Sequence, residues 1–196
     1  MNITVVGTGY VGLVTGVSLG LAGHTVYCVG RNKEKIGRIN QGTPPFFEPG
    51  LPEALSSVIR KKNFLATDKL EESIAQSEIT VIAVGTPTVD GKIDLTQINA
   101  ACRDIGKAMA LRNSYHVVVV KSTVIPGTTE HVVKPILEQH SGKRTGEFGL
   151  CMSPEFLREG SAMTDALSPD RIVIGQYDEK SGSAYAKAYH GSKCPI

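Results

Sequence analysis

The feature that most constrains the fold of this chain is a glycine pattern near its amino terminus. Gly7, Gly9 and Gly12 follow a short apolar run at residues 3–6 and begin a stretch of helical character at residues 11–22. A strand, a glycine turn and a helix in this order are typical of a site for a dinucleotide pyrophosphate. The first glycine allows the tight turn, the second lets the backbone approach the phosphates, and the third lets the helix lie close to the strand. We therefore predict a dinucleotide at the positive end of the helix dipole, with packing alone as the alternative.

Apolar runs of strand length recur along the chain, with helical segments between them. This alternation predicts an α/β fold, a doubly wound and mainly parallel sheet with helices on both faces. The runs are continuous in Val and Ile, as expected when both faces of a sheet are covered. One Rossmann-like, dinucleotide-binding domain over residues 1–196 follows from this pattern. The expected strands are residues 3–6, 25–29, 64–66, 80–84, 116–120, 149–152 and 171–174.

Two helix starts are predicted from capping patterns. Asp68 with Glu71, and Asp94 with Gln97, have the spacing of a capping box. In this motif the first side chain binds a free backbone N–H and the second reaches back to the cap. We expect each pair in the first turn of a helix.

Composition excludes several classes of function. With 41% hydrophobic and 20% charged residues, the chain of 196 residues has enough apolar side chains for one core. Its formal charge of +2 is too small to indicate a nucleic acid or a membrane surface as partner. No signal peptide and no run of about 18 apolar residues is visible, so we expect a cytoplasmic protein. The cysteines, at positions 28, 102, 151 and 194, lack metal-ligand spacing, and we expect free thiols and no metal site.

Three polar loops follow expected strands, at the edge of the sheet where folds of this type bind ligands. They comprise residues 85–88, 121–127 and 153–160, and we expect them to converge on one cleft with the glycine turn. The hydroxyls of Thr86 and Thr123 suit a ribose, a phosphate or a bound water. Turn formation or helix capping is the alternative for both threonines.

Glu155 is the candidate acid or base of the third loop. It lies beside Phe156, and partial burial there would raise the pKa of its carboxyl and suit it to accept a proton or orient a water. The alternative is an ion pair with Arg158 or Arg171.

The end of the second expected strand departs from the usual pattern of NAD sites. An acidic residue normally binds the adenosine ribose hydroxyls there, but this chain has Gly30, followed by Arg31, Asn32 and Lys33. Loss of a carboxylate and gain of cations favour a 2′-phosphate, so NADP is an alternative to NAD. A solvated Arg31 and a helix-capping Asn32 are the other explanation. We expect Gly30→Asp to favour NAD over NADP.

Residues 41–50 are too rich in proline to form a helix and carry two aromatic residues, Phe46 and Phe47. We expect this segment either to fold over a ligand or to pack against the domain.

Six motifs in order connect the chain to a known family. They are Gly7-Thr8-Gly9-Tyr10-Val11-Gly12, Phe47-Glu48-Pro49-Gly50-Leu51, Gly85-Thr86-Pro87-Thr88, Lys121-Ser122-Thr123-Val124, Ser153-Pro154-Glu155-Phe156-Leu157-Arg158-Glu159-Gly160 and Pro169-Asp170-Arg171-Ile172-Val173-Ile174-Gly175. Together they resemble the N-terminal domain of the UDP-glucose/GDP-mannose dehydrogenase family. The resemblance implies a two-fold, NAD-dependent oxidation of the C6 alcohol of a nucleotide sugar to a carboxylate, through a covalent cysteine intermediate. UDP-glucose is the substrate that we expect, with GDP-mannose and UDP-N-acetylmannosamine as alternatives.

The resemblance also assigns roles to residues of this chain. Thr123 and Glu155 would position the water that hydrolyses the thioester. The residues expected at the sugar-nucleotide site are Glu155, Phe156, Leu157 and Arg158. The residues expected to bind the dinucleotide are Gly7, Gly9, Tyr10, Val11, Gly12, Arg31, Lys35, Thr86, Pro87, Thr123 and Glu159.

The sequence stops at Cys194-Pro195-Ile196, where members of the family continue. The resemblance implies that a central helix, which forms the homodimer, and a C-terminal UDP-binding domain with the nucleophilic cysteine lie outside this chain. None of the four cysteines present has the family's nucleophile context, and Cys194 is expected near the start of a last strand. We therefore expect a cofactor-binding fragment. The alternatives are a stand-alone NAD(P)-binding module and a 3-hydroxyacid or phosphogluconate type of dehydrogenase.

Overall fold

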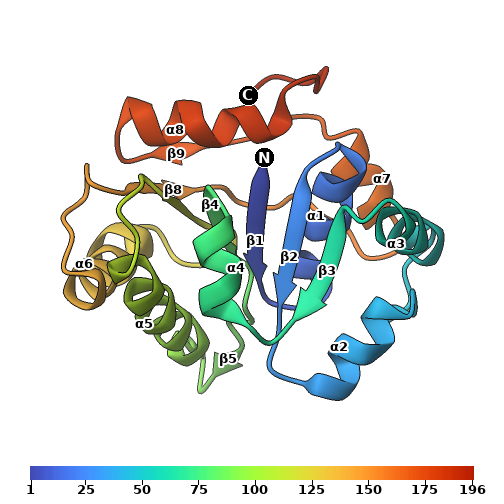
Figure 1. Ribbon diagram of the computed structural model, residues 1–196, viewed down its shortest axis with the longest axis horizontal. Coiled ribbons are helices and arrows are strands. Elements are labelled where there is room, and N and C mark those ends of the chain that lie inside the picture. Colours follow the sequence, from blue (N-terminus) through green and yellow to red (C-terminus); the bar gives the residue numbers. More distant parts are fainter.

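A seven-stranded sheet forms the centre of the computed structural model, which describes all of residues 1–196 (Figure 1). Its strands are β1 (Asn2–Val6), β2 (Thr25–Val29), β3 (Phe64–Thr67), β4 (Ile79–Ile82), β7 (Val117–Val120), β8 (Gly149–Met152) and β9 (Gly175–Gln176). In space their order is β3-β2-β1-β4-β7-β8-β9. All neighbours pair in parallel except β8 and β9, which are antiparallel. The chain turns from one half of the sheet to the other between β1 and β4, which is where doubly wound sheets bind ligands.

Helices cover both faces of the sheet. They are α1 (Tyr10–Leu21), α2 (Lys33–Asn40), α3 (Leu51–Arg60), α4 (Leu70–Gln76), α5 (Thr96–Ala110), α6 (Lys134–Ser141), α7 (Ala162–Leu167) and α8 (Glu179–Ala186), with a π-helical turn η1 (Thr129–Val133) before α6 and a 3-10 turn η2 (Lys187–Tyr189) after α8. The core on one face joins the sheet to α1, α2, α3, α7 and α8. The core on the other face joins it to α4, α5, η1 and α6. The predicted α/β architecture is confirmed.

Strand β7 shows why the expected strands lack alternation. Val117 and Val119 belong to the core on one face, and Val118 and Val120 belong to the core on the other. All four side chains are buried. Because both faces are covered, a polar residue at any of these positions would lose its contact with water.

The expected strand at residues 171–174 is wrong. The edge strand is β9, at the two residues that follow, and it pairs Cys151 with Gln176 and Met152 with Gly175. The backbone N–H of Ile172 donates instead to the carbonyl oxygen of Pro195, 2.9 Å away. The hydrogen bonds of this segment therefore go to the C-terminal end of the chain rather than to the sheet. Cys194 lies in that irregular end, and not at the start of a strand.

Both expected capping boxes are also wrong. Asp68 does not cap α4, and its carboxylate lies 3.8 Å from the ammonium of Lys33. Asp94 accepts a hydrogen bond from the backbone N–H of Thr96 at 2.8 Å, so it stabilises the start of α5 without the reciprocal bond expected from Gln97. Short polar side chains before a helix satisfy free N–H groups in more than one geometry, which spacing alone does not distinguish.

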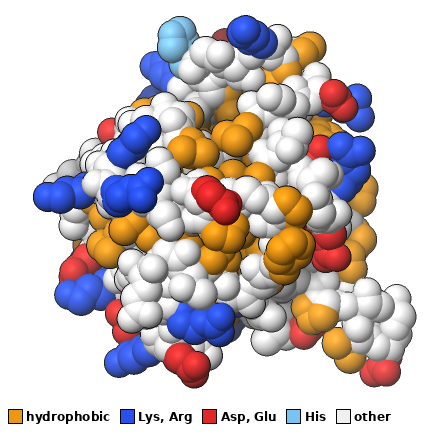
Figure 2. Space-filling view, turned by 90° about the vertical axis from the view of Figure 1, so that its right-hand side faces the viewer, with side chains coloured by type: hydrophobic (Ala, Val, Ile, Leu, Met, Phe, Trp, Pro, Cys, Tyr) orange, Lys and Arg blue, Asp and Glu red, His pale blue; other side chains and the backbone are white.

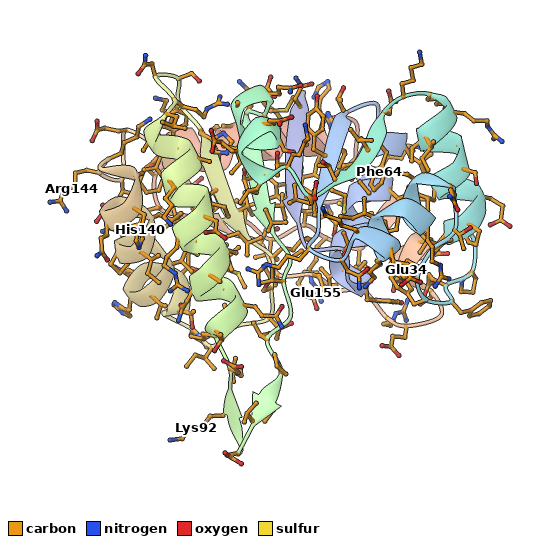
Figure 3. All side chains as sticks on the ribbon, turned by 60° about the horizontal axis from the view of Figure 1, so that its bottom comes forward. Glu34, Phe64, Lys92, His140, Arg144 and Glu155 are labelled. Carbon is orange, nitrogen blue, oxygen red and sulfur yellow. The ribbon has the colours of Figure 1, made fainter.

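A two-stranded hairpin, β5 (Thr88–Val89) and β6 (Lys92–Ile93), leaves the sheet after β4. Figure 3 shows it, with Lys92 labelled, projecting away from the body of the domain. Figure 2 shows the face on which α3 and α7 lie, where exposed hydrophobic side chains gather between scattered charges. No helix combines the length and hydropathy that crossing a bilayer requires.

Candidate active site

The glycine turn between β1 and α1 has the predicted geometry. Gly7 has a φ of 130°, and a Cβ atom there would lie 2.2 Å from the carbonyl oxygen of Ala83. A Cβ atom at Gly12 would lie 2.0 Å from the carbonyl oxygen of Gly7, so the close approach of α1 requires glycine. A Cβ atom at Gly9 would meet no atom within 4 Å, because this residue borders open space. The first and third glycines are therefore required by the fold, and the second leaves room for a ligand.

Backbone N–H groups at the start of α1 are available to an anion. Gly9 is the N-cap residue, no side chain caps the helix, and its first turn has no acidic residue. The N–H groups of Tyr10, Val11 and Gly12 have no partner within an α-helix. They form a ready-made anion site at the positive end of the helix dipole.

A cavity of about 500 Å³ continues from the glycine turn to the ends of β2 and β3. Gly30, Arg31 and Lys35 line one part of it, together with Thr8 and Asp68. The predicted alternative role of Asn32 is confirmed, because its Oδ1 accepts the backbone N–H of Lys35 at 2.8 Å and caps α2. The cavity has the position of a site for the adenosine half of a dinucleotide.

Part of the segment at residues 41–50 packs against the domain, which was one of the two expectations, whereas Phe47 is 88% exposed. The ring of Phe46 lies 5.2 Å from the ring of Tyr10, and Glu48 is only 1% exposed. The carboxylate of Glu48 accepts hydrogen bonds from the Tyr10 hydroxyl at 2.6 Å, from the Gly160 N–H at 2.9 Å and from the Ala162 N–H at 2.8 Å. Burial alone raises the pKa of this carboxyl, but these hydrogen bonds outweigh it and hold the pKa below its usual value.

Glu48 therefore ties the glycine turn to the third polar loop. Its partner Tyr10 also lies 3.1 Å from the carbonyl oxygen of Arg158, so the tyrosine side chain supports the loop and only its backbone N–H remains for a cofactor. No pattern in the sequence predicts a role for this glutamate. The signal that was available is an acidic residue within a non-helical segment rich in proline and aromatic residues.

Thr86, Thr123 and Glu155 come together at the carboxyl ends of the strands, as predicted. The expected single cleft with the glycine turn is wrong, because Gly85 lines the cavity at that turn, whereas Lys121 and residues 153–158 line a separate one. The hydroxyl of Thr86 donates to the carbonyl oxygen of Thr123 at 2.7 Å. The hydroxyl of Thr123 lies 3.5 Å from Oε1 of Glu155, at the outer limit for a direct hydrogen bond. Figure 3 shows Glu155 between α5 and α2, at the edge of the domain from which the hairpin projects.

Glu155 is half-buried and forms no ion pair with Arg158 or Arg171, so that alternative is wrong. Arg158 binds Asp165 instead, with Nη2 and Oδ1 separated by 2.6 Å. This hydrogen bond lowers the pKa of Asp165 to about 2. Asp165 was not among the predicted residues.

The four residues expected at the sugar-nucleotide site line a second cavity, of about 400 Å³. Its wall includes Glu155, Leu157 and Arg158, and also Phe156, whose ring lies 5.1 Å from the Arg171 guanidinium. The remaining residues that were expected to bind a cofactor lie outside both cavities. Pro87 accepts the backbone N–H of Asp94 at the base of the hairpin, and Glu159 is exposed close to the Tyr10 hydroxyl, whose pKa its charge helps to raise.

The cysteines are free, as predicted, and three of them are buried. Burial raises the pKa of the Cys28 and Cys102 thiols to about 12 and also raises that of Cys151. These thiols carry almost no thiolate at neutral pH and are unsuited to act as nucleophiles.

A mainly parallel sheet, a glycine turn with free N–H groups, and polar side chains at the carboxyl ends of the strands define a dinucleotide-binding α/β domain. Comparison with known proteins agrees. Residues 1–192 match the UDP-glucose/GDP-mannose dehydrogenase family, NAD binding domain. The chain belongs to this family and forms its NAD-binding domain.

Two similar relatives are enzymes named for different substrates. The GDP-mannose 6-dehydrogenase of Azotobacter vinelandii is 41% identical, and the UDP-glucose 6-dehydrogenase of Bacillus subtilis is 42% identical, over all of this chain. The chain spans 45% and 44% of the lengths of these relatives.

Two solved structures have nearly the same fold. A GDP-mannose dehydrogenase from Pseudomonas aeruginosa has a TM-score of 0.97 and 39% identity over all of this chain and 45% of its own. A UDP-glucose dehydrogenase from Pyrobaculum islandicum has a TM-score of 0.93 and 41% identity, over 98% of this chain and 44% of its own.

Proposed function

We propose that this chain is the cofactor-binding part of a nucleotide-sugar 6-dehydrogenase. The reaction converts the C6 alcohol of a hexose nucleotide to a carboxylate in two oxidations, and each transfers one hydride to a nicotinamide. The observation that supports it best is that the Thr123 hydroxyl and the Glu155 carboxylate lie 3.5 Å apart at the carboxyl ends of the strands. A hydroxyl and a carboxylate in this arrangement suit a water that attacks an acyl group.

The proposal assigns roles to backbone groups of the glycine turn and to three side chains. The N–H groups at the start of α1 bind the diphosphate of the cofactor. Thr123 and Glu155 contact the same water, and the carboxylate of Glu155 accepts its proton as the oxygen attacks the thioester carbon. Thr86 fixes the backbone of Thr123. We expect the cysteine that carries the acyl group in a part of the enzyme outside this chain: the thiols of Cys28, Cys102 and Cys151 are buried, and Cys194 lies in the irregular C-terminal end.

UDP-glucose is the proposed substrate, and GDP-mannose is the second candidate. Relatives named for these two sugars are 37–42% identical to this chain. Those named for UDP-N-acetylmannosamine, with their N-acetylated sugar, are 26–29% identical, which makes such a substrate the weaker choice.

Calorimetric titration of the 196-residue chain with NAD tests the cofactor site, and Gly9→Ala locates it. Because a Cβ atom at Gly9 meets no protein atom, we expect this variant to fold normally but to bind NAD about tenfold more weakly or worse. Gly37→Ala on α2 is the matched control, since it too adds a methyl group in open space, but outside the turn. Unchanged affinity in Gly9→Ala would show that the glycine turn is not the site. Turnover assays of the complete enzyme with UDP-glucose and with GDP-mannose would separate the two substrates.

A further inference from the structure

The ribose end of the cofactor cavity lacks the side chain that an NAD site of this fold normally uses. Gly30 stands at the end of β2, where a carboxylate would accept hydrogen bonds from the two ribose hydroxyls. Its backbone N–H donates to the carbonyl oxygen of Thr67 at 2.9 Å, so the residue is held in line with the ends of β2 and β3.

Packing keeps an acidic side chain out of this position. A Cβ atom at Gly30 would lie 2.7 Å from Cγ2 and 2.9 Å from Oγ1 of Thr8. Thr8 is 9% exposed and belongs to the glycine turn, so it is fixed in place. Our expectation that Gly30→Asp alone would favour NAD therefore needs correction, because the new side chain would collide with Thr8. Replacing Thr8 by Ala removes the two nearest atoms and leaves only its Cβ, at an ordinary distance of 3.4 Å.

The charged side chains around the same space favour an anion. Arg31 and Lys35 line the cavity, and neither has an acidic partner within 4 Å. Asp68 and Asp104 also line it. Asp68, which directly follows β3, lies 3.8 Å from the ammonium of Lys33. The two unpaired cations are therefore the groups available to a ligand at the end of β2.

We propose that this domain binds NADP in preference to NAD, with the 2′-phosphate held by Arg31 and Lys35. The inference rests on the dinucleotide site of the proposed function. A guanidinium presents several N–H donors in a planar fork that matches phosphate oxygens, and an ammonium adds a second positive charge. Without a carboxylate at Gly30, nothing on β2 repels the phosphate or binds a free 2′-hydroxyl in its place.

Calorimetric titration of the 196-residue chain with NADP and with NAD, in the same low-salt buffer, tests the proposal. We expect NADP to bind about tenfold more tightly. Arg31→Gln should bring the two affinities within about twofold by weakening NADP alone. Arg38→Gln, the same change at an exposed residue of α2 outside the cavity, is the matched control and should leave the ratio as it is. Adenosine 2′,5′-bisphosphate should compete better than adenosine 5′-monophosphate.

The double variant Thr8→Ala/Gly30→Asp should reverse the preference toward NAD, and its thermal unfolding shows whether it is folded. Tighter binding of NAD than NADP, with no effect of Arg31→Gln, would overturn the proposal. So would a loss of NAD affinity in Asp68→Asn, because Asp68 would then serve as the ribose carboxylate. Failure of both dinucleotides to bind would refute the proposed function itself, whereas NAD binding without NADP preference refutes this inference alone.

Discussion

Replacement of Glu48 by Gln is the sharpest test of the link between the glycine turn and the third polar loop. The side chain is 1% exposed, and its two oxygens accept three hydrogen bonds, from the Tyr10 hydroxyl and the Gly160 and Ala162 N–H groups. Glutamine has the same shape, but its amide nitrogen cannot accept a hydrogen bond. The glutamine amide loses fewer hydrogen bonds when its nitrogen takes the place of Oε1, which accepts only the Ala162 N–H. The amide N–H of the glutamine and the backbone N–H of Ala162 are then two buried donors that face each other.

The expected cost follows from these contacts. One bond to a charged acceptor is lost, the other two become bonds to a neutral one, and a buried donor is left without a partner. We expect the free energy of unfolding to fall by about 2–4 kcal/mol. The measurement is urea unfolding of the 196-residue chain at pH 7, followed by circular dichroism, with the slope of the transition checked for two-state behaviour.

Two further variants and the pH dependence of stability serve as controls for the Glu48→Gln experiment. Glu53→Gln, an exposed residue in the first turn of α3, should cost no more than about 0.5 kcal/mol. Tyr10→Phe removes one donor and should cost about 1–2 kcal/mol. Because hydrogen bonds lower the pKa of Glu48 in the folded state, its contribution is present above the pKa of the unfolded chain and is lost as pH falls through the lower folded value. A loss below about 1 kcal/mol in Glu48→Gln would refute the reasoning.

Three other predictions follow from the same structure. Gly12→Ala should destabilise the fold by about 3 kcal/mol, because its Cβ atom would collide with backbone; a normal unfolding temperature would contradict the close approach of α1. Burial, aided by the charge of Arg112, lowers the pKa of His116 to about 3, while unfolded histidine titrates near 6.5. As pH falls below about 6.5 the unfolded chain therefore gains a proton first, and stability should drop by about 1.4 kcal/mol per pH unit. His116→Gln should remove that slope, and an unchanged slope would assign it to other groups. In the complete dehydrogenase, Glu155→Gln should slow hydrolysis of the acyl-enzyme more than it weakens cofactor binding, as measured by burst kinetics; an unchanged turnover rate would exclude this role.

The sequence predicted the architecture well because its signals are local. Continuous apolar runs, such as residues 117–120, identify strands that are covered on both faces. The glycine turn was predicted correctly for the same reason, since each glycine answers a backbone requirement within one strand–turn–helix unit. The strand predicted at residues 171–174 is wrong because Ile172 finds its partner in the distant Pro195, which no local pattern indicates.

For the three polar loops, the sequence predicts which side chains lie close together but not which partners they bind. Because the carboxyl ends of parallel strands share one edge of the sheet, the sequence predicts that Thr86, Thr123 and Glu155 lie close together. The position of a residue at this edge does not predict its hydrogen-bond or ion-pair partner. Arg158 binds Asp165, and Glu155 forms no ion pair. Such partners depend on how loops pack after the sheet has formed.

The sequence by itself therefore determined the class of fold, the position of the dinucleotide turn and the family of the chain. Each of these depends on short segments, in which hydrophobic pattern and backbone requirements are set by a few neighbouring residues. Only the tertiary structure decided that Glu48 joins the turn to a loop 112 residues away, and that Thr8 occupies the space beside Gly30. Contacts of this kind are set by the exclusion of atoms from the same space and by the need of buried polar groups for partners. Both conditions exist only once the chain has folded.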